Sequence, residues 1–322
     1  MRKDSKIFVA GHRGLAGSAI MRRLQALGFA NLIVRTHAEL DLTNQRAVQE
    51  FFEAERPAVV LIAAGKVGGI YANNTYRGDF IYQNLAIQMN VIHQAYRVGV
   101  KRLLALGSSC IYPRDCPQPI KEEYLLTGPL EPTNQPYAIA KIAAIEMCWS
   151  YNRQYDTQYL CGMPTNLYGP GDTYNLQNSH VLPALIRKFH EAKIRGESSA
   201  VVWGTGSPMR EFLYSDDMAD ACVHLVCLPD VEIKSILNNR HPPLINIGYG
   251  KDISIRTLAE LVRRTIGSDA ELTWDDSKPD GTPRKLLDST RLAKLGWNAK
   301  TPIELGLRLA YEDFQSGPDS RV

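Results

Sequence analysis

The chain lacks the segments that would carry it into a membrane or through a secretory route. Its longest apolar stretch, Ala58 to Ala64, is far shorter than the roughly 20 residues that a membrane-spanning helix requires. The apolar run behind the charged N-terminus stops at Gly11, which is too short for the apolar core of a signal peptide. These two absences predict a cytoplasmic protein with no membrane segment.

Concentrated charge and paired cysteines are also lacking. The 37 Lys and Arg residues nearly balance 34 Asp and Glu, and no segment interleaves basic residues with aromatics, so we expect no nucleic-acid partner. The six cysteines form no C-x-x-C pair and have no histidine at zinc-site spacing, which predicts reduced thiols and no metal. With 322 residues, 44% of them hydrophobic, the chain is long enough to bury a large core.

Short β-branched runs alternate with helical patterns through the first half of the chain. Strands are expected at 6–10, 31–35, 59–64, 102–106 and 159–163, and helices at 15–27, 45–55, 81–97 and 137–153. This alternation predicts an α/β fold with a Rossmann-type, doubly wound parallel sheet. Shorter elements follow residue 164, apart from an apolar run at 244–247 that returns to the sheet.

The change of pattern near residue 165 suggests two domains. We expect a dinucleotide-binding domain over 1–165, with a returning segment near 212–250, and a smaller C-terminal α/β domain over 166–322 that binds substrate. The Pro-rich stretch at 112–134 has no strong periodicity and is predicted to be an active-site loop.

A glycine-rich segment joins the first strand to the first helix. It reads Gly11-His12-Arg13-Gly14-Leu15-Ala16-Gly17. Glycines at these positions allow a tight turn and a close approach of the backbone to a pyrophosphate, which the N-terminus of the helix then faces. The segment therefore predicts a dinucleotide cofactor.

The end of the second predicted strand bears on which dinucleotide is bound. NAD-binding chains usually have an acidic residue there, whereas this chain reads Val34-Arg35-Thr36-His37. Arg13 and Arg35 could bind a 2′-phosphate, which favours NADP, although both could simply be solvated. Asp41 could accept a hydrogen bond from adenine or could cap the helix near Gln45.

Two segments carry groups suited to carbonyl chemistry. Tyr137 and Lys141 lie four residues apart on one helix face, where a cation favours the phenolate of a tyrosine whose pKa is ordinarily ~10. Ser108, in Gly107-Ser108-Ser109, follows a strand at its carboxyl end, where ligands bind in open parallel sheets. A serine hydroxyl there can donate to a substrate carbonyl.

These residues resemble those of the short-chain dehydrogenase/reductase superfamily, in its extended, sugar-nucleotide branch. Further motifs are similar to those of the GDP-L-fucose synthase family, and the resemblance covers essentially the whole chain. The motifs lie at 64–70, 72–75, 107–113, 164–170, 178–181 and 278–285. The resemblance implies an NADPH-dependent bifunctional epimerase/reductase that converts GDP-4-keto-6-deoxy-D-mannose to GDP-L-fucose by 3,5-epimerisation and reduction of the 4-ketone.

The family's catalytic residues map onto Ser108, Tyr137 and Lys141, and its acid-base pair onto Cys110 and His180. Epimerisation beside a ketone proceeds through an enolate, which hydrogen-bond donors stabilise. Each inversion needs a base on one face of the sugar and an acid on the other. A thiol and an imidazole suit these roles, because their ordinary pKa values of ~8.5 and ~6.5 lie close to neutral pH. Which of the two is the base, and which inversion comes first, stays open.

The resemblance also implies binding residues and a homodimer formed by the helices at 81–97 and 137–153. Substrate contacts are implied for Lys188, Trp203, Arg210 and Asp280. His37 stands where the family often has an arginine. Cofactor contacts are implied for Gly11, His12, Arg13, Gly14, Leu15, Ala16, Gly17, Arg35, His37, Asp41, Leu106, Gly107, Ser108, Ser109, Lys141, Pro164, Thr165, Asn166, Leu167 and His180.

Two other functions stay open. Another NDP-sugar 4-epimerase or 4,6-dehydratase would share the fold, Tyr137 and Lys141, but dehydratases of this branch carry an acidic pair where this chain has Ser109-Cys110-Ile111. A non-catalytic NADP-sensing regulator would be expected to have lost the tyrosine or the lysine. Both residues are present here.

Overall fold

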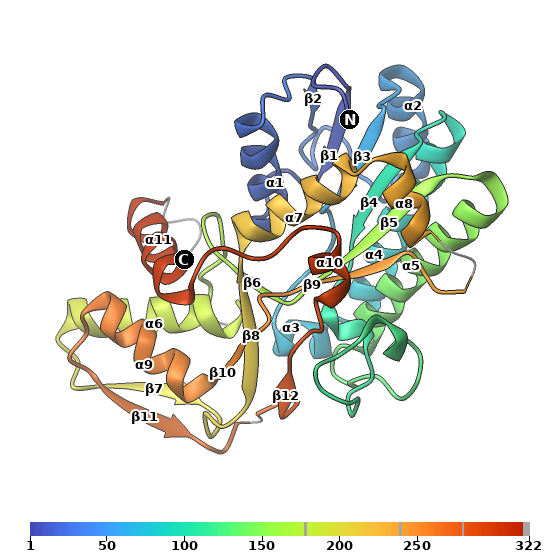
Figure 1. Ribbon diagram of the computed structural model, residues 1–322. Helices are drawn as coiled ribbons and strands as arrows, with labels where there is room; N and C mark the ends of the chain where they lie inside the picture. Colours follow the sequence, from blue (N-terminus) through green and yellow to red (C-terminus); the bar gives the residue numbers. More distant parts are fainter. Residues whose placement is uncertain (177–178, 238–239, 279, 318–322) are drawn as a thin grey trace.

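The computed structural model describes residues 1–176, 179–237, 240–278 and 280–317. Two motif residues, Asn178 and Pro279, lie outside these ranges. The chain forms a larger lobe around a central parallel sheet and a smaller lobe beside the carboxyl ends of its strands (Figure 1).

The central sheet has six strands in the order β2-β1-β3-β4-β5-β9, and every neighbouring pair is parallel. This confirms the predicted Rossmann-type sheet. Helices α1 and α7 cover one face, and α2, α4 and α5 the other (Figure 1). The strands are β1 (Ile7–Ala10), β2 (Leu32–Ile33), β3 (Val59–Ile62), β4 (Arg102–Leu106), β5 (Gln158–Pro164) and β9 (Leu244–Ile247). The helices are α1 (Leu15–Ala26), α2 (Gln45–Glu55), α4 (Arg77–Arg97), α5 (Gln135–Tyr155) and α7 (Ser215–Cys227).

Burial on both faces explains why β1 and β3 are apolar without alternation. In β1, Ile7 and Val9 pack in the cluster that includes the buried residues of α1 and α7. Phe8 and Ala10 point to the other face, in the cluster with α2, α4 and α5. All four residues are at most 1% exposed, so a polar residue at any of them would lack a partner.

The chain reverses its direction of travel across the sheet between β1 and β3. Strand β2 lies on one side of β1, whereas β3, β4 and β5 follow on the other side. Such a switch point opens a crevice at the carboxyl ends of the strands, where ligands of doubly wound sheets bind. The loops that begin at Gly11, Ala63, Gly107 and Thr165 all leave strands at this edge.

The smaller lobe contains two sheets and three packed helices. Strands β10, β8 and β12 form one sheet, to which β6 is joined through β8, and β7 pairs with β11 in the other. The strands are β6 (Asn166–Tyr168), β7 (Ser199–Trp203), β8 (Met209–Tyr214), β10 (Asp252–Ser254), β11 (Glu271–Asp275) and β12 (Arg284–Lys285). The packed helices are α6 (Val181–Arg195), α9 (Ile255–Ile266) and α11 (Ile303–Ser316).

Short helices connect these parts. They are α3 (Ile70–Thr75), α8 (Asp230–Ile236), α10 (Thr290–Lys294) and the 3₁₀ turns η1 (Ser109–Ile111) and η2 (Glu122–Tyr124). Between the elements of the smaller lobe, the chain returns to the larger one, where α7 packs on α1 and β9 completes the central sheet.

Local hydrogen bonds explain where the elements differ from the predicted ranges. Strand β2 covers only Leu32–Ile33, because the chain turns at Thr36, whose N–H donates to the Glu39 carboxylate at 2.7 Å. The alternative that Asp41 caps the helix near Gln45 is wrong. The cap of α2 is Asn44, which accepts from the Ala47 N–H at 3.1 Å, and Asp41 instead accepts from the Thr43 N–H at 2.9 Å.

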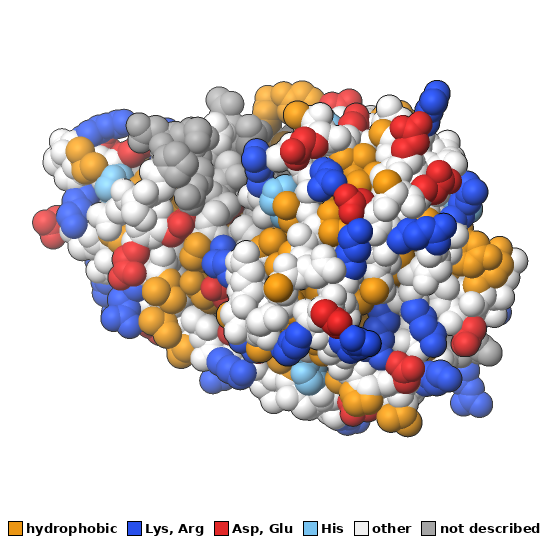
Figure 2. Space-filling view, turned by 90° about the horizontal axis from the view of Figure 1, so that it is seen from above, with side chains coloured by type: hydrophobic (Ala, Val, Ile, Leu, Met, Phe, Trp, Pro, Cys, Tyr) orange, Lys and Arg blue, Asp and Glu red, His pale blue; other side chains and the backbone are white. Residues whose placement is uncertain are grey.

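The surface agrees with the balanced composition. On the face seen in Figure 2, Lys and Arg side chains are interspersed with Asp and Glu, and neither sign dominates. No helix within the described ranges combines the length and the apolar character needed to cross a membrane.

Candidate active site

The glycine-rich loop after β1 forms a cradle that side chains would fill. Gly11 has φ +83°, and a Cβ added there would lie 2.6 Å from the backbone nitrogen of Ala64. A Cβ on Gly17 would overlap the carbonyl oxygen of Gly11. Gly14 precedes α1 with extended backbone and no side-chain cap, which leaves the first N–H groups of the helix open to an anion. This loop fits the pyrophosphate of a dinucleotide.

The two arginines that could bind a 2′-phosphate differ in their surroundings. Arg13 is exposed and takes part in no ion pair within the described residues. Arg35 pairs with Glu55 at 2.6 Å and lies over the ring of Phe51. Arg13 is therefore the residue free to bind a phosphate, whereas Arg35 would have to leave Glu55 or share it. His37 is exposed.

Tyr137 lies in the first turn of α5 and is buried. Its ring meets Phe80 edge-on, with centroids 6.2 Å apart, and its phenol is hydrogen-bonded to Ser108. Burial raises the pKa of Tyr137, as does the neighbouring Cys110, while the Ser108 hydrogen bond lowers it. The net direction is upward, opposite to the lowering expected from Lys141, because burial is the largest cause. Tyr137 is therefore a proton donor at neutral pH.

Lys141 lies one turn further along α5, and its ammonium donates to the carbonyl oxygen of Leu106 at 2.8 Å. The ammonium nitrogen is 5.7 Å from the centroid of the Tyr137 ring. Burial lowers the pKa of Lys141 to about 8. The hydrogen bond to Leu106 places this cation at the end of β4, directly before the Gly-Ser-Ser segment.

Cys110 lies between the two lobes in the turn that follows β4. Its thiol packs in the small apolar cluster that contains Phe80 and Tyr137. The sulfur accepts from the side-chain amide of Asn134 at 3.3 Å and from the ammonium of Lys285 at 3.8 Å. Ser108, Cys110, Tyr137 and Lys141, all predicted to be catalytic, thus lie together.

His180 approaches from the smaller lobe, where it directly precedes α6. It is exposed, yet desolvation by the surrounding protein lowers the pKa of His180, and the positive charge of Lys285 lowers it further. Lys285 thus interacts with both the predicted acid and the predicted base. At neutral pH the imidazole is neutral.

The four predicted substrate residues form two contacting pairs in the smaller lobe. The Lys188 ammonium is 5.3 Å from the centroid of the Trp203 ring, which is 57% exposed. Arg210 lies beside Asp280, whose carboxylate accepts from the Thr205 N–H at 2.8 Å. Arg210 also interacts electrostatically with Cys110. The second pair therefore borders the thiol.

The remaining predicted cofactor residues line the carboxyl edge of β4 and β5. A Cβ on Gly107 would overlap the side chain of Met163. Thr165 and Asn166 both donate side-chain hydrogen bonds to the carbonyl oxygen of Glu211, at 3.2 and 2.8 Å. Leu106 and Ser109 are buried, Pro164 ends β5 and Leu167 is half-buried in the core of the larger lobe.

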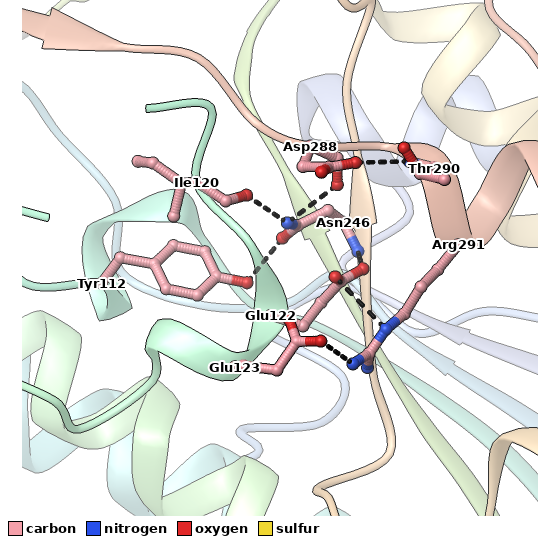
Figure 3. Close-up of polar contacts among 8 residues, drawn as sticks. All are labelled: Tyr112, Ile120, Glu122, Glu123, Asn246, Asp288, Thr290 and Arg291. Atoms are coloured by element: carbon pink, nitrogen blue, oxygen red, sulfur yellow. Dashed lines mark hydrogen bonds and ion pairs between the residues drawn. The ribbon is translucent and has the colours of Figure 1, made fainter. Parts of the chain in front are cut away.

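Sequence reasoning missed a buried polar network centred on Asn246 of β9 (Figure 3). Asn246 accepts from the Tyr112 hydroxyl at 2.6 Å and donates to the carbonyl oxygens of Ile120 and Asp288. Its backbone N–H donates to Glu122 at 3.0 Å. These bonds hold the loop after Cys110 against the central sheet. The available signal was an asparagine inside the apolar run Leu-Ile-Asn-Ile.

Charged residues complete this network (Figure 3). Arg291 pairs with Glu122 at 3.4 Å and with Glu123 at 2.9 Å. Burial raises the pKa of Glu122. The network therefore fastens the segment that precedes α10 to the same loop.

A second missed residue, Glu211 of β8, is completely buried. Its carboxylate accepts from the backbone N–H of Gly250 at 2.7 Å and of Leu287 at 3.0 Å. Burial raises its pKa. The hydrogen bond to Leu287 holds the segment 284–291, here called the strap, whose Lys285 contacts Cys110. No group of His, Cys, Asp and Glu in the described ranges is arranged to hold a metal ion.

Comparison with known proteins agrees with this geometry. Residues 7–247 match the model of the NAD dependent epimerase/dehydratase family. The chain is 58% identical to GDP-L-fucose synthase 1 of Arabidopsis thaliana, over 96% of this chain and 93% of that protein. It is 52% identical to GDP-L-fucose synthase of Escherichia coli K12, over 98% of both chains.

Among solved structures, a GDP-L-fucose synthetase from Naegleria fowleri bound to NADP superposes with a TM-score of 0.86. It is 26% identical to this chain, over 98% of this chain and 95% of that one. The identities to the Arabidopsis and Escherichia proteins span nearly the full length of each. The chain belongs to the NAD dependent epimerase/dehydratase family and, within it, to the GDP-L-fucose synthases.

Proposed function

We propose that this protein converts GDP-4-keto-6-deoxy-D-mannose to GDP-L-fucose, by inverting C3 and C5 and reducing the 4-ketone with NADPH. The observation that carries the proposal is the position of Cys110, whose thiol shares one apolar cluster with Tyr137. Ketone reduction needs Tyr137 with its supporting Ser108 and Lys141 but no second acid-base group, whereas epimerisation also needs a group such as the thiol. The family relationship supports the same reaction.

We infer that the glycine-rich loop 11–17 and the carboxyl edge of β4 and β5 hold the cofactor, with Arg13 at the 2′-phosphate. The cofactor, when bound, supplies hydride to the ketone carbon. The open N–H groups of α1 suit its pyrophosphate, and Arg13 suits a further phosphate because a guanidinium binds phosphate oxygens in a bidentate manner. Lys141 would support both Tyr137 and the ribose of the bound cofactor.

Each inversion consists of two proton transfers. A base removes the proton from the carbon beside the ketone, and the electron pair of the C–H bond moves onto the carbonyl oxygen. Ser108 and Tyr137 stabilise this enolate by donating hydrogen bonds. An acid on the opposite face returns a proton to the same carbon, and the ketone re-forms. We propose that Cys110 and His180 are this pair, because they reach the site from different lobes.

Reduction uses the proton that burial keeps on Tyr137. As hydride reaches the ketone carbon, the phenol gives its proton to the oxygen, and the neighbouring Lys141 ammonium stabilises the resulting phenolate. The raised pKa of Tyr137 supports this direction of transfer, since the phenol is the form present at neutral pH.

We further propose that the smaller lobe, within 166–322, binds the GDP-sugar. Lys188 and Arg210 would pair with the diphosphate, Trp203 would cover a flat or apolar face, and Asp280 would accept hydroxyl or amino hydrogens. Two copies are proposed to pair through α4 and α5. These helices expose Tyr82, Met89 and Ile139 to solvent, as an apolar dimer face would.

The decisive experiment incubates the protein with GDP-4-keto-6-deoxy-D-mannose and NADPH, and reads the stereochemistry of the product by NMR. The expected result is GDP-L-fucose, with one NADPH oxidised per sugar. Turnover without net oxidation would instead identify a 4-epimerase or dehydratase. Reduction without inversion would identify a simple ketoreductase, and absence of any turnover would favour a regulator.

We also propose that the protein acts in the cytoplasm. None of its six cysteines forms a disulfide bond, which is consistent with a reducing compartment.

A further inference from the structure

Asn134 occupies the N-cap position of α5 but does not cap the helix. An asparagine at this position normally accepts a hydrogen bond from an N–H of the first turn. In this chain Asn44 does so for α2, accepting from Ala47 at 3.1 Å. The side chain of Asn134 makes no such bond. The side chain makes a different contact instead.

The side chain of Asn134 contacts Cys110. The side-chain N–H of Asn134 donates to the Cys110 sulfur at 3.3 Å. The carbonyl oxygen of the same amide is buried and has no hydrogen-bond partner in the described part of the chain. A helix cap and a satisfied buried carbonyl both stabilise a fold, so this side chain forgoes two favourable interactions to reach the thiol. Buried polar groups without a partner are uncommon in folded proteins, and a role at a functional site is one explanation for them.

The contact links the Cys110 sulfur to the helix that carries the Tyr137 phenol, and the proposed reaction needs these two groups at a fixed distance and direction. Asn134 precedes Tyr137 by three residues, at the start of the helix that also carries Lys141. Cys110 belongs to the turn after β4, and no covalent constraint fixes the direction of its sulfur. The amide of Asn134 therefore ties the sulfur to the helix of the phenol, while Lys285 contacts the sulfur from the strap at 3.8 Å.

Other charged groups near the sulfur are engaged with partners of their own. Arg114 pairs with Glu131 at 3.4 Å, and Arg284 pairs with Asp252 at 2.6 Å. Arg210 lies beside Asp280, although it also interacts electrostatically with the thiol. Around Cys110, the neutral amide of Asn134 and the ammonium of Lys285 are thus the donors in direct contact.

We propose that Asn134 is a positioning residue for the two epimerisations, and that its side-chain amide sets the direction of the Cys110 sulfur relative to Tyr137. The inference rests on the proposed function in so far as Cys110 is taken to exchange protons with the sugar. It assigns no role to Asn134 in hydride transfer, which depends on Tyr137, Ser108 and Lys141.

The test uses Asn134→Ser, since serine is a good N-cap but is too short to replace the amide at the sulfur. Deuterium uptake from D₂O into the ring of GDP-4-keto-6-deoxy-D-mannose measures the proton transfers. We expect exchange to fall by about 10- to 100-fold, the loss typical of a reacting group misplaced by about 1 Å. The midpoint of thermal unfolding should not fall. Exchange within about twofold of the parent would overturn the proposal.

Two further variants separate positioning from capping. Asn134→Asp keeps the size and the capping capacity but removes the N–H donor, and we expect it to lose exchange at least as severely. Asn44→Ser, at the true cap of α2, is the matched control and should leave exchange unchanged. If Asn134→Asp retained exchange, the donor would be irrelevant and the proposal wrong.

A second experiment does not use the sugar. It measures the rate at which iodoacetamide alkylates Cys110 over a range of pH, with the product followed by mass spectrometry. Cys116 is also partly buried and serves as the internal reference. We expect Asn134→Ser to change the rate and the pH profile of Cys110 but not those of Cys116. Identical Cys110 profiles would refute the positioning role. If the parent exchanged no protons while the profiles differed, the proposed function would fail and the contact would stand.

Discussion

Replacing Lys141 by methionine is expected to make the fold more stable at neutral pH while removing ketone reduction. Lys141 is 4% exposed, and burial lowers its pKa from 10.5 to about 8. A lysine whose folded pKa is lowered opposes folding whenever it is charged in both states. The cost is therefore fully present below pH 8 and disappears as the pH rises past 10.5.

The magnitude follows from this shift. The difference between 10.5 and about 8 corresponds to roughly 3 kcal/mol at about 1.4 kcal/mol per unit. Methionine removes this cost but leaves the Leu106 carbonyl without its 2.8 Å donor, which costs about 1–3 kcal/mol. A net gain of roughly 1 kcal/mol is expected at pH 7. At pH 10 less than about 1 kcal/mol of the lysine cost remains, so the variant should be the less stable protein.

Urea unfolding at pH 7 and pH 10 measures this change of sign. Lys193→Met is the matched control, because Lys193 also donates to a carbonyl oxygen, that of Ile266 at 2.7 Å, but is less buried. It should destabilise the protein at both pH values. The reasoning would be refuted if Lys141→Met were less stable than the parent at pH 7, or if its difference from the parent did not depend on pH.

Three further changes test the site. Arg13→Ala should lower kcat/KM for NADPH by about 10- to 100-fold, because one charge-assisted hydrogen bond is lost. The kcat/KM for NADH should not change, and equal losses for the two cofactors would exclude a 2′-phosphate contact. Cys110→Ser should stop deuterium exchange into the sugar without changing NADP affinity in a fluorescence titration; unimpaired exchange would contradict its role. Glu122→Gln should be at least as stable as the parent in urea at pH 7. A carboxyl whose pKa is raised in the folded state opposes folding when it is ionised in both states. The stability gained by the glutamine should therefore vanish below pH 4.5, where the carboxyl is protonated in both states.

The central sheet was predictable because its chemistry is local. The runs 7–10 and 59–62 are apolar at every position, and 102–106 and 244–247 are apolar at every position but one, as expected for strands buried on both faces. Their short lengths exclude long helices. The glycine loop, the Tyr-Lys spacing and the Gly-Ser-Ser turn are also contiguous patterns. Each of them lies at a carboxyl end of the sheet or begins a helix there.

The polar contacts that hold the loops of the site in place were not predictable, because the two partners of each contact are distant in sequence. The Asn246 N–H meets Glu122 across 124 residues, and Leu287 meets Glu211 across 76. Arg35 was expected to be available to a phosphate, but its pairing with Glu55 becomes visible only when β2 and α2 are placed. Asn134 was predicted to be the last residue of the loop 112–134. The sequence does not show that its side chain contacts Cys110 in place of the helix N-terminus.

Glu211 links the smaller lobe to the central sheet and to the strap. Its carboxylate bonds Gly250, after β9 of the central sheet, and Leu287 in the strap, while its backbone oxygen receives Thr165 and Asn166 from the end of β5. A fully buried carboxylate is tolerated only when such donors are in place, because each missing donor leaves its negative charge uncompensated. Partial separation of the lobes would expose or orphan this group, and Lys285 would leave Cys110 in the same movement. Stability of the interlobe junction and assembly of the acid-base pair therefore depend on the same hydrogen bonds.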